Sequence, residues 1–75
     1  MRITVKVIGG LVSRLGFAEQ EREVPAGTTA GSLLAAVGIG DPQTVITTRN
    51  GHGVAPGDEL HDGDRILVSP PFSGG

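Results

Sequence analysis

The chain of 75 residues contains no cysteine, tryptophan or tyrosine, and its only aromatic side chains are Phe17 and Phe72. The lack of cysteine excludes a disulfide framework, a thiolate metal site and a cysteine nucleophile carried on this chain. Two aromatics offer little surface on which bases stack, and no basic stripe accompanies them, which argues against a nucleic-acid-binding protein. Any chemistry must therefore use other groups.

The chain also lacks long apolar runs and a large excess of charge of either sign. Its six basic and eight acidic residues give a net charge of −2. No segment approaches the length of a membrane span. The opening MRITVKVIGG alternates polar and apolar residues and lacks the apolar centre of a secretory signal. We therefore expect a cytoplasmic protein of one small domain with a thin core, which buries only about 60% of its unfolded surface.

A strand pattern opens the chain. Apolar and polar residues alternate over residues 2–8, with Ile8 falling on the polar side of the alternation, and Gly9-Gly10 ends the strand. Residues 10–20 suggest a loop or a short turn of helix. Residues 21–24 predict a second strand, which would pair with the first as an antiparallel hairpin.

A short helix is predicted next. Thr28 and Thr29 are hydroxyl residues suited to an N-cap, and Gly38 stands where a left-handed C-cap is expected. Four apolar residues between them have the spacing of a surface helix that packs on a sheet: Ala30, Leu33, Leu34 and Val37.

The second half of the chain predicts more strands. Residues 44–49 are rich in β-branched side chains and precede an Asn50-Gly51 turn. Residues 54–60 suggest a short edge segment, and residues 65–69 a last strand that Pro70-Pro71 ends, because proline cannot donate a ladder hydrogen bond.

The order of these elements is strand, strand, helix, strand, short strand, strand. It predicts an α+β protein of the ubiquitin-like β-grasp type, in which one helix packs on a small mixed sheet. The first and last strands would lie side by side and parallel at its centre. We expect residues 1–69 to form the domain and residues 70–75 an extended tail.

The last seven residues, SPPFSGG (69–75), have features that folding does not explain. Pro70 and Pro71 form a stiff spacer, and Phe72 has no evident core to join, so we expect it to anchor on a partner. The small Ser73 and the bare Gly74 suit threading into a narrow channel. Gly75 presents a carboxylate, a poor electrophile that must be activated, for example by adenylation, before a nucleophile attacks it.

The segment DGDRILVSPPFSGG resembles the carboxyl end of the MoaD/ThiS sulfur-carrier family, most of all the small subunit of molybdopterin synthase. PAGTTAGSLLAAVG, RNGHGV and GGLVSRLGF are also similar to family segments, the last to the molybdopterin branch. GIGDPQTV is shorter than in that branch, and is more like the thiazole carriers and the archaeal modifiers. The pathway therefore stays open between these alternatives.

The resemblance implies a carrier and not an enzyme. A partner adenylating enzyme would activate Gly75 with ATP and magnesium, and a sulfur donor would convert the adenylate to a thiocarboxylate. The large subunit of the synthase, or an analogous acceptor enzyme, would then receive the sulfur during molybdenum or tungsten cofactor biosynthesis. The alternatives are a modifier joined to lysines of other proteins, a sulfur carrier for thiazole synthesis, and a binding module without terminal chemistry.

Other candidate residues favour plain structural interpretations. His52 and His61 lie in predicted turns without a third ligand, so we expect no metal site. Asp62 and Asp64 resemble a carboxylate pair, but aspartate bonds its own backbone in turns. Arg49 and Arg65 suit either an acidic partner groove or a solvated strand face.

Overall fold

Buried and more exposed side chains alternate along the first strand, so the sheet has one face toward the core and one toward solvent. The computed structural model of the chain describes residues 1–71. In β1 (Arg2–Val7) every second side chain is buried, and the strand pairs antiparallel with β2 (Glu19–Glu23). A short helix, α1 (Leu11–Leu15), connects the two strands and buries Leu11.

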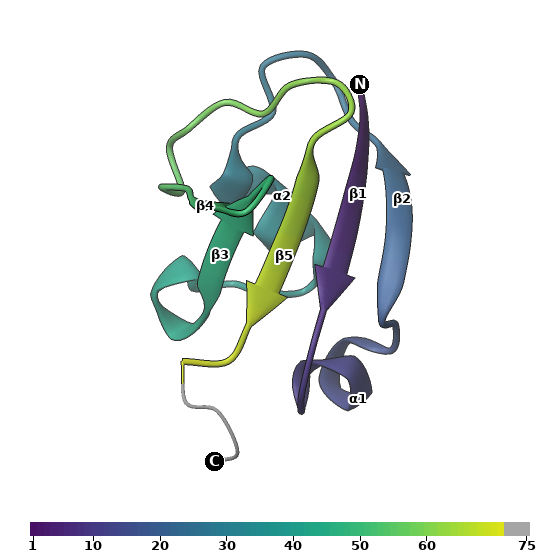
Figure 1. The fold of residues 1–75 in the computed structure, drawn as a ribbon, viewed down its shortest axis with the longest axis vertical. Coiled ribbons are helices and arrows are strands. Elements are labelled where there is room, and N and C mark those ends of the chain that lie inside the picture. Colours follow the sequence, from purple (N-terminus) through teal and green to yellow (C-terminus); the bar gives the residue numbers. More distant parts are fainter. Residues whose placement is uncertain (72–75) are drawn as a thin grey trace.

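The last strand, β5 (Arg65–Ser69), lies at the centre of a five-stranded sheet with the order β2-β1-β5-β3-β4. It runs parallel to β1 on one side and antiparallel to β3 (Ile46–Arg49) on the other, as Figure 1 shows. The two-residue β4 (His52–Gly53) closes the far edge. The predicted parallel pairing of the first and last strands is confirmed.

The helix α2 (Ala30–Val37) covers one face of the sheet (Figure 1). The Thr29 hydroxyl accepts a hydrogen bond from the Ser32 N–H at 3.2 Å, and Gly38 ends the helix with a left-handed φ of 110°. The predicted caps and apolar stripe are confirmed. The core between helix and sheet contains only apolar side chains: Ile3, Val5, Val7, Leu11, Ala30, Leu33, Leu34, Val37, Ile39, Leu60, Ile66 and Val68.

The loop before β5 crosses the start of α2 at close range. The Ala30 N–H donates to the Asp58 carbonyl at 3.0 Å, and the Gly31 N–H donates to the Pro56 carbonyl at 2.8 Å. These bonds, with the Thr29 cap, satisfy the first free N–H groups of the helix. The helix start therefore serves the fold and offers no open anion site.

A buried carboxylate joins two turns at the start of β5. Asp64 is only 6% exposed, and its Oδ2 accepts from the His61 N–H at 2.8 Å. Its Oδ1 accepts from the Asn50 side chain at 3.1 Å, while Asn50 Oδ1 accepts from the Arg65 N–H at 2.9 Å. Asp64 therefore joins the Asn50-Gly51 turn to the turn that precedes β5.

Three predicted boundaries need correction. The second strand is Glu19–Glu23 and starts two residues earlier than predicted, because Glu19 already pairs with Lys6 of β1. The third strand starts at Ile46, since Asp41 caps a 3₁₀ turn, η1 (Pro42–Thr44).

The edge segment predicted at 54–60 lies instead at His52–Gly53. The stretch that follows contributes only a single bridge, between Glu59 and Thr29. This bridge forms because the loop follows the start of α2 and not the edge of the sheet.

We expect Asp64→Ala to lower the free energy of unfolding by about 2 kcal/mol, because the His61 N–H and the Asn50 amide lose a shared acceptor. Asp41→Ala removes the same charge from an exposed turn cap and should cost about 0.5–1 kcal/mol. Urea unfolding of both variants measures the difference. Equal losses would contradict the role given to Asp64.

We expect Gly31→Ala to destabilise the protein by about 1 kcal/mol, although alanine normally favours a helix. An added Cβ would stand 3.0 Å from the Pro56 carbonyl oxygen. Gly10 is the matched control, because it has helical backbone angles and nothing within 4 Å of an added Cβ. Thermal unfolding should show that Gly10→Ala is neutral or stabilising. A gain for Gly31→Ala would mean that the loop contact is unimportant.

Candidate functional site

The base of the predicted tail is the end of the central strand. β5 is paired along both sides, and its last residue, Ser69, pairs with Ile46 of β3. On the other side, the Ile8 N–H donates to the Val68 carbonyl at 3.3 Å. The point at which Pro70 leaves the sheet is therefore fixed by backbone bonds from both neighbours.

A close contact from the first turn further positions this point. Gly9 has a left-handed φ of 64°, and an ideal Cβ at this position would stand 3.3 Å from Pro70 Cγ. A side chain there would be strained and would press against the proline. The sequence indicated only that Gly9-Gly10 ends a strand, because spacing cannot show a contact across 61 positions.

Four of the predicted tail residues, Phe72, Ser73, Gly74 and Gly75, lie outside the described residues, and their roles stay predictions. Pro70 is half-buried and Pro71 is exposed. Neither proline, nor Gly9 beside them, has a side chain that can transfer a proton or attack a substrate. The described part of this site can present a chain end, but it supplies no acid, base or nucleophile.

The histidines are exposed, and both aspartates accept backbone hydrogen bonds, although Asp62 accepts from β1 and not from its own turn. His52 is exposed in β4, and His61 is exposed with its Nδ1 3.9 Å from Asp64 Oδ2. Asp62 accepts a hydrogen bond from the Arg2 N–H at 2.7 Å. Over residues 1–71, no group of three or more potential ligands stands close enough together to hold a metal ion.

Arg49 and Arg65, which suited either an acidic partner groove or a solvated strand face, lie on opposite faces of the sheet. Arg49 pairs with the buried Ile66, and its guanidinium donates to the Glu59 carbonyl at 2.9 Å. Its Nε also stands 3.9 Å from Asp64. Arg49 therefore supports the fold, whereas Arg65 is exposed on the face away from α2, opposite Thr4 of β1.

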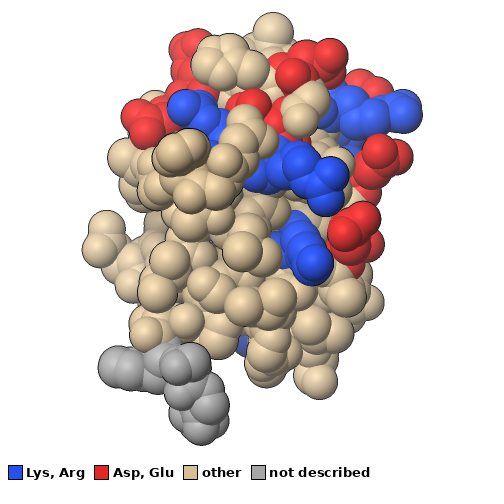
Figure 2. Space-filling view, in the orientation of Figure 1, with Lys and Arg blue, Asp and Glu red and all other residues tan. Residues whose placement is uncertain are grey.

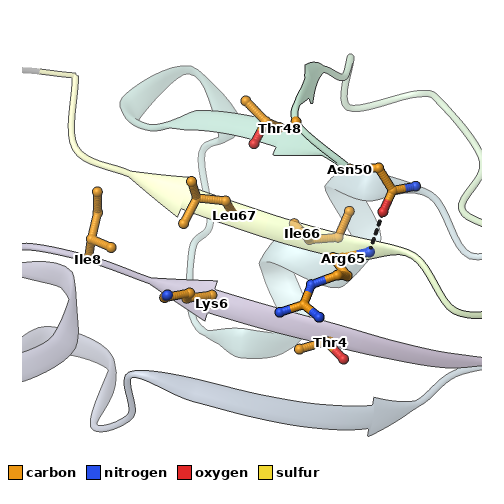
Figure 3. A pocket seen from close by; sticks show the side chains of 9 residues that line it. Thr4, Lys6, Ile8, Thr48, Asn50, Arg65, Ile66 and Leu67 are labelled. Carbon is orange, nitrogen blue, oxygen red and sulfur yellow. Dashed lines mark hydrogen bonds between the residues drawn. The ribbon is translucent and has the colours of Figure 1, made fainter.

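A shallow depression of about 590 Å³, which was not predicted from the sequence, lies on the face of the sheet away from α2. Figure 3 shows the Arg65 guanidinium over β1, between Lys6 and Thr4, with Ile8 and Leu67 nearer the tail. The lining residues are Thr4, Lys6, Ile8, Thr48, Asn50, Gly51, Arg65, Ile66 and Leu67. One signal was available, because Ile8 is an apolar residue on the polar side of the β1 alternation.

The helices in the described part of the chain are short. None of those within residues 1–71 combines the length and the apolar character that a membrane crossing requires.

Solved structures with the same fold include the H. volcanii small archaeal modifier protein 1, which is 21% identical with a TM-score of 0.82 over 95% of this chain and 98% of that one. A putative molybdopterin converting factor subunit 1 from Pyrococcus furiosus is 24% identical, with a TM-score of 0.83 over 96% and 99%.

A third likeness is to a chain in the complex of subunits 1 and 2 of the molybdopterin-converting factor from Helicobacter pylori. It is 20% identical, with a TM-score of 0.68 over the full length of both chains. These likenesses establish the β-grasp fold. A model of the ThiS family matches residues 5–75. The chain therefore belongs to the ThiS family, a family of small ubiquitin-like sulfur-carrier and modifier proteins.

Proposed function

We propose that this protein is a sulfur carrier whose Gly75 carboxylate is adenylated and converted to a thiocarboxylate, which donates sulfur in molybdenum or tungsten cofactor biosynthesis. The observation that carries the proposal is the continuity of β5 with the tail. A central strand of a ThiS-family domain runs into Pro70-Pro71 and then into the sequence Phe-Ser-Gly-Gly. Residues 1–69 would act as the rigid domain and residues 70–75 as the reactive tail.

The proposed chemistry takes place in two steps on one carbonyl carbon. A Gly75 carboxylate oxygen attacks the α-phosphorus of ATP, pyrophosphate leaves, and an acyl-adenylate forms. A hydrosulfide ion from the sulfur donor then attacks the acyl carbon and displaces AMP, and loss of its proton leaves a thiocarboxylate whose sulfur is the later nucleophile. The partner enzyme would bind ATP and magnesium and supply the catalytic groups, since Pro70, Pro71 and Gly9 have none.

Two partners follow from this chemistry. The first is an adenylating enzyme related to the ubiquitin-activating enzymes, and the second is an acceptor such as the large subunit of molybdopterin synthase. The Helicobacter pylori structure supports the second partner, because it is a complex of subunits 1 and 2 of that factor. Phe72, Pro71 and Pro70 would contact the partner, while Ser73 and Gly74 would thread toward its active site.

A protein modifier is the second candidate function. The likeness to small archaeal modifier protein 1 favours it, and so does the short connection between α2 and β3. The same adenylate would serve, because a lysine amine attacks it to form an isopeptide bond as AMP leaves. A carrier for thiazole synthesis would differ only in the enzyme that receives the sulfur.

We expect intact-mass measurement to show sulfur transfer when the protein is incubated with the adenylating enzyme, ATP, magnesium and a sulfur source. The mass should rise by the exchange of one oxygen for one sulfur. Deletion of Gly75 should abolish the change, because Ser73-Gly74 then ends the chain one residue too short for the active site.

The control for this experiment is the same mixture without ATP, which should leave the mass unchanged. A mass gain that survives deletion of Gly75 would contradict the assignment of the reactive group. Gly-Gly remnants on lysines of other proteins after protease digestion of a cell extract, together with no sulfur gain, would favour the modifier.

We expect Gly9→Ala to slow thiocarboxylate formation by about tenfold, because the added Cβ displaces Pro70 at the base of the tail. Gly16→Ala is the matched control. Gly16 also has a left-handed φ, 86°, but nothing lies within 4 Å of an added Cβ. Both variants should lose about 1–2 kcal/mol of stability from the backbone strain. Equal reaction rates in the two variants would show that the Gly9 contact does not position the tail.

A further inference from the structure

The turn between β3 and β4 has a sequence that favours loss of a side-chain amide. An asparagine amide is attacked by the backbone nitrogen of the next residue, and this attack is least hindered when that residue is glycine, which has no Cβ. Asn50 is the single asparagine of the chain, and both it and Gly51 are exposed. Nothing lies within 4 Å of a Cβ added at Gly51. Water therefore reaches both residues of the turn.

The Asn50 amide is held by the residues at the start of β5. Asn50 Oδ1 accepts from the Arg65 N–H at 2.9 Å, the bond drawn in Figure 3, and Nδ2 donates to Asp64 Oδ1 at 3.1 Å. The Asn50 N–H also donates to the Arg65 carbonyl at 2.8 Å. These three bonds direct the side-chain carbon, Cγ, toward β5. Both polar atoms of the amide are therefore occupied in the native protein.

Loss of this amide takes two steps in which water is the only other reactant. The Gly51 nitrogen gives its proton to hydroxide and attacks Asn50 Cγ, the Cγ–Nδ2 bond breaks, and ammonia leaves with a proton from water. Water then opens the five-membered imide. Opening at Cγ gives aspartate, and opening at the main-chain carbonyl gives isoaspartate, with one more methylene in the backbone.

The native bonds restrict the first of these steps. Within residues 1–71 the Gly51 N–H donates to no backbone carbonyl, so its own bonding does not restrain the nitrogen. The Asn50 Cγ, by contrast, can approach that nitrogen only when the side chain leaves Arg65 and Asp64. The attack therefore requires a local opening of the turn.

The product would place a second carboxylate beside a buried one. A carboxylate oxygen would stand where Nδ2 now donates, 3.1 Å from Asp64 Oδ1, and Asp64 is only 6% exposed. Like charges at this distance repel, and burial weakens the screening by water. Most acidic and basic side chains on the face shown in Figure 2 gather toward the end where β5 begins. Arg49, whose Nε stands 3.9 Å from Asp64 Oδ2, offsets part of the repulsion.

We propose that Asn50-Gly51 is a deamidation site that the native fold keeps closed, and that its conversion to aspartate or isoaspartate loosens the start of β5. The inference goes beyond the proposed function and does not depend on it, because no step involves the tail. Departure of ammonia makes the conversion irreversible. Each opening of the turn exposes the amide to attack, so chains that have opened lose the bond between Asn50 and Asp64 permanently.

The first test follows deamidation of the full chain at mildly alkaline pH by intact mass, which rises as one NH₂ group is exchanged for one OH group. The native chain should react at least about tenfold more slowly than the same chain in guanidinium chloride. Asp64→Ala removes the acceptor of Asn50 Nδ2 and should speed the reaction of the native chain at least about threefold. Asp62→Ala is the matched control, since Asp62 accepts from the Arg2 N–H instead, and should change the rate less than about twofold.

Two features of the chain keep this measurement clear. Asn50 is the single asparagine, so protease mapping of the product has only to exclude Gln20 and Gln43. The comparison of native and unfolded wild-type chains needs no substitution, so the test stands even if Asp64→Ala does not fold.

A second test measures the effect of the modification on the fold. Asn50→Asp imitates one of the two products and should lower Tm by about 4–8 °C, the shift that the net loss of one hydrogen bond causes in a domain of this size. Gln43→Glu is the matched control, because it makes the same change from amide to carboxylate on an exposed residue of η1. It should shift Tm by less than about 2 °C.

Each outcome decides for or against the site. Equal deamidation rates in the native and unfolded chains would show that the fold does not protect Asn50, and would overturn the inference. It would also be overturned if Asp64→Ala reacted no faster than Asp62→Ala, or if Asn50→Asp were as stable as Gln43→Glu. A slow native reaction that Asp64→Ala releases, with a lower Tm for Asn50→Asp, would support it.

Discussion

The pairing of β5 with a strand on each side is the constraint on which the rest of the structure depends. Its parallel bonds to β1 and antiparallel bonds to β3 place the last strand at the centre of the sheet, with Ile66 and Val68 in the core. A strand held on both sides and buried on one face is among the last parts of a domain to open. The tail therefore starts from a strand whose backbone is bonded to a neighbour on each side.

Both ends of β5 are held by specific contacts. At its start, Asn50 accepts from the Arg65 N–H and is itself bonded to the buried Asp64. At its far end, Gly9 approaches Pro70 and leaves no space for a side chain. This arrangement suits a protein whose part in the proposed reaction is to present a chain end in a fixed direction, while another protein supplies the catalytic groups.

The sequence predicted the topology well, because its signals are local. The alternation of residues 2–8, the Thr29 and Gly38 caps and the proline stop after Ser69 each follow from short-range chemistry, and the structure confirms them. The errors occurred where contacts between residues far apart in the sequence, or a cap at a turn, determine the local structure. A β-branched run predicted a strand at Thr44, but Asp41 caps a turn there, and the edge segment moved to His52 because the following loop bonds to α2.

The candidate site was only partly accessible from sequence. Motifs indicated the reactive tail, but the depression on the face of the sheet away from α2 depends on the register that places Lys6 beside Leu67, and no local pattern contains that register. Likewise, nothing in the spacing of Arg49 and Arg65 shows that one serves the fold and the other lies free on the surface.

The central claim is that a free carboxylate at Gly75 is the group that the partner activates. Pyrophosphate exchange into ATP, catalysed by the adenylating enzyme, measures this directly when the wild-type chain is compared with a chain carrying one extra alanine after Gly75. The account predicts rapid exchange with the wild type and none with the extended chain, in which Gly75 is part of a peptide bond. Equal exchange with both chains would contradict it.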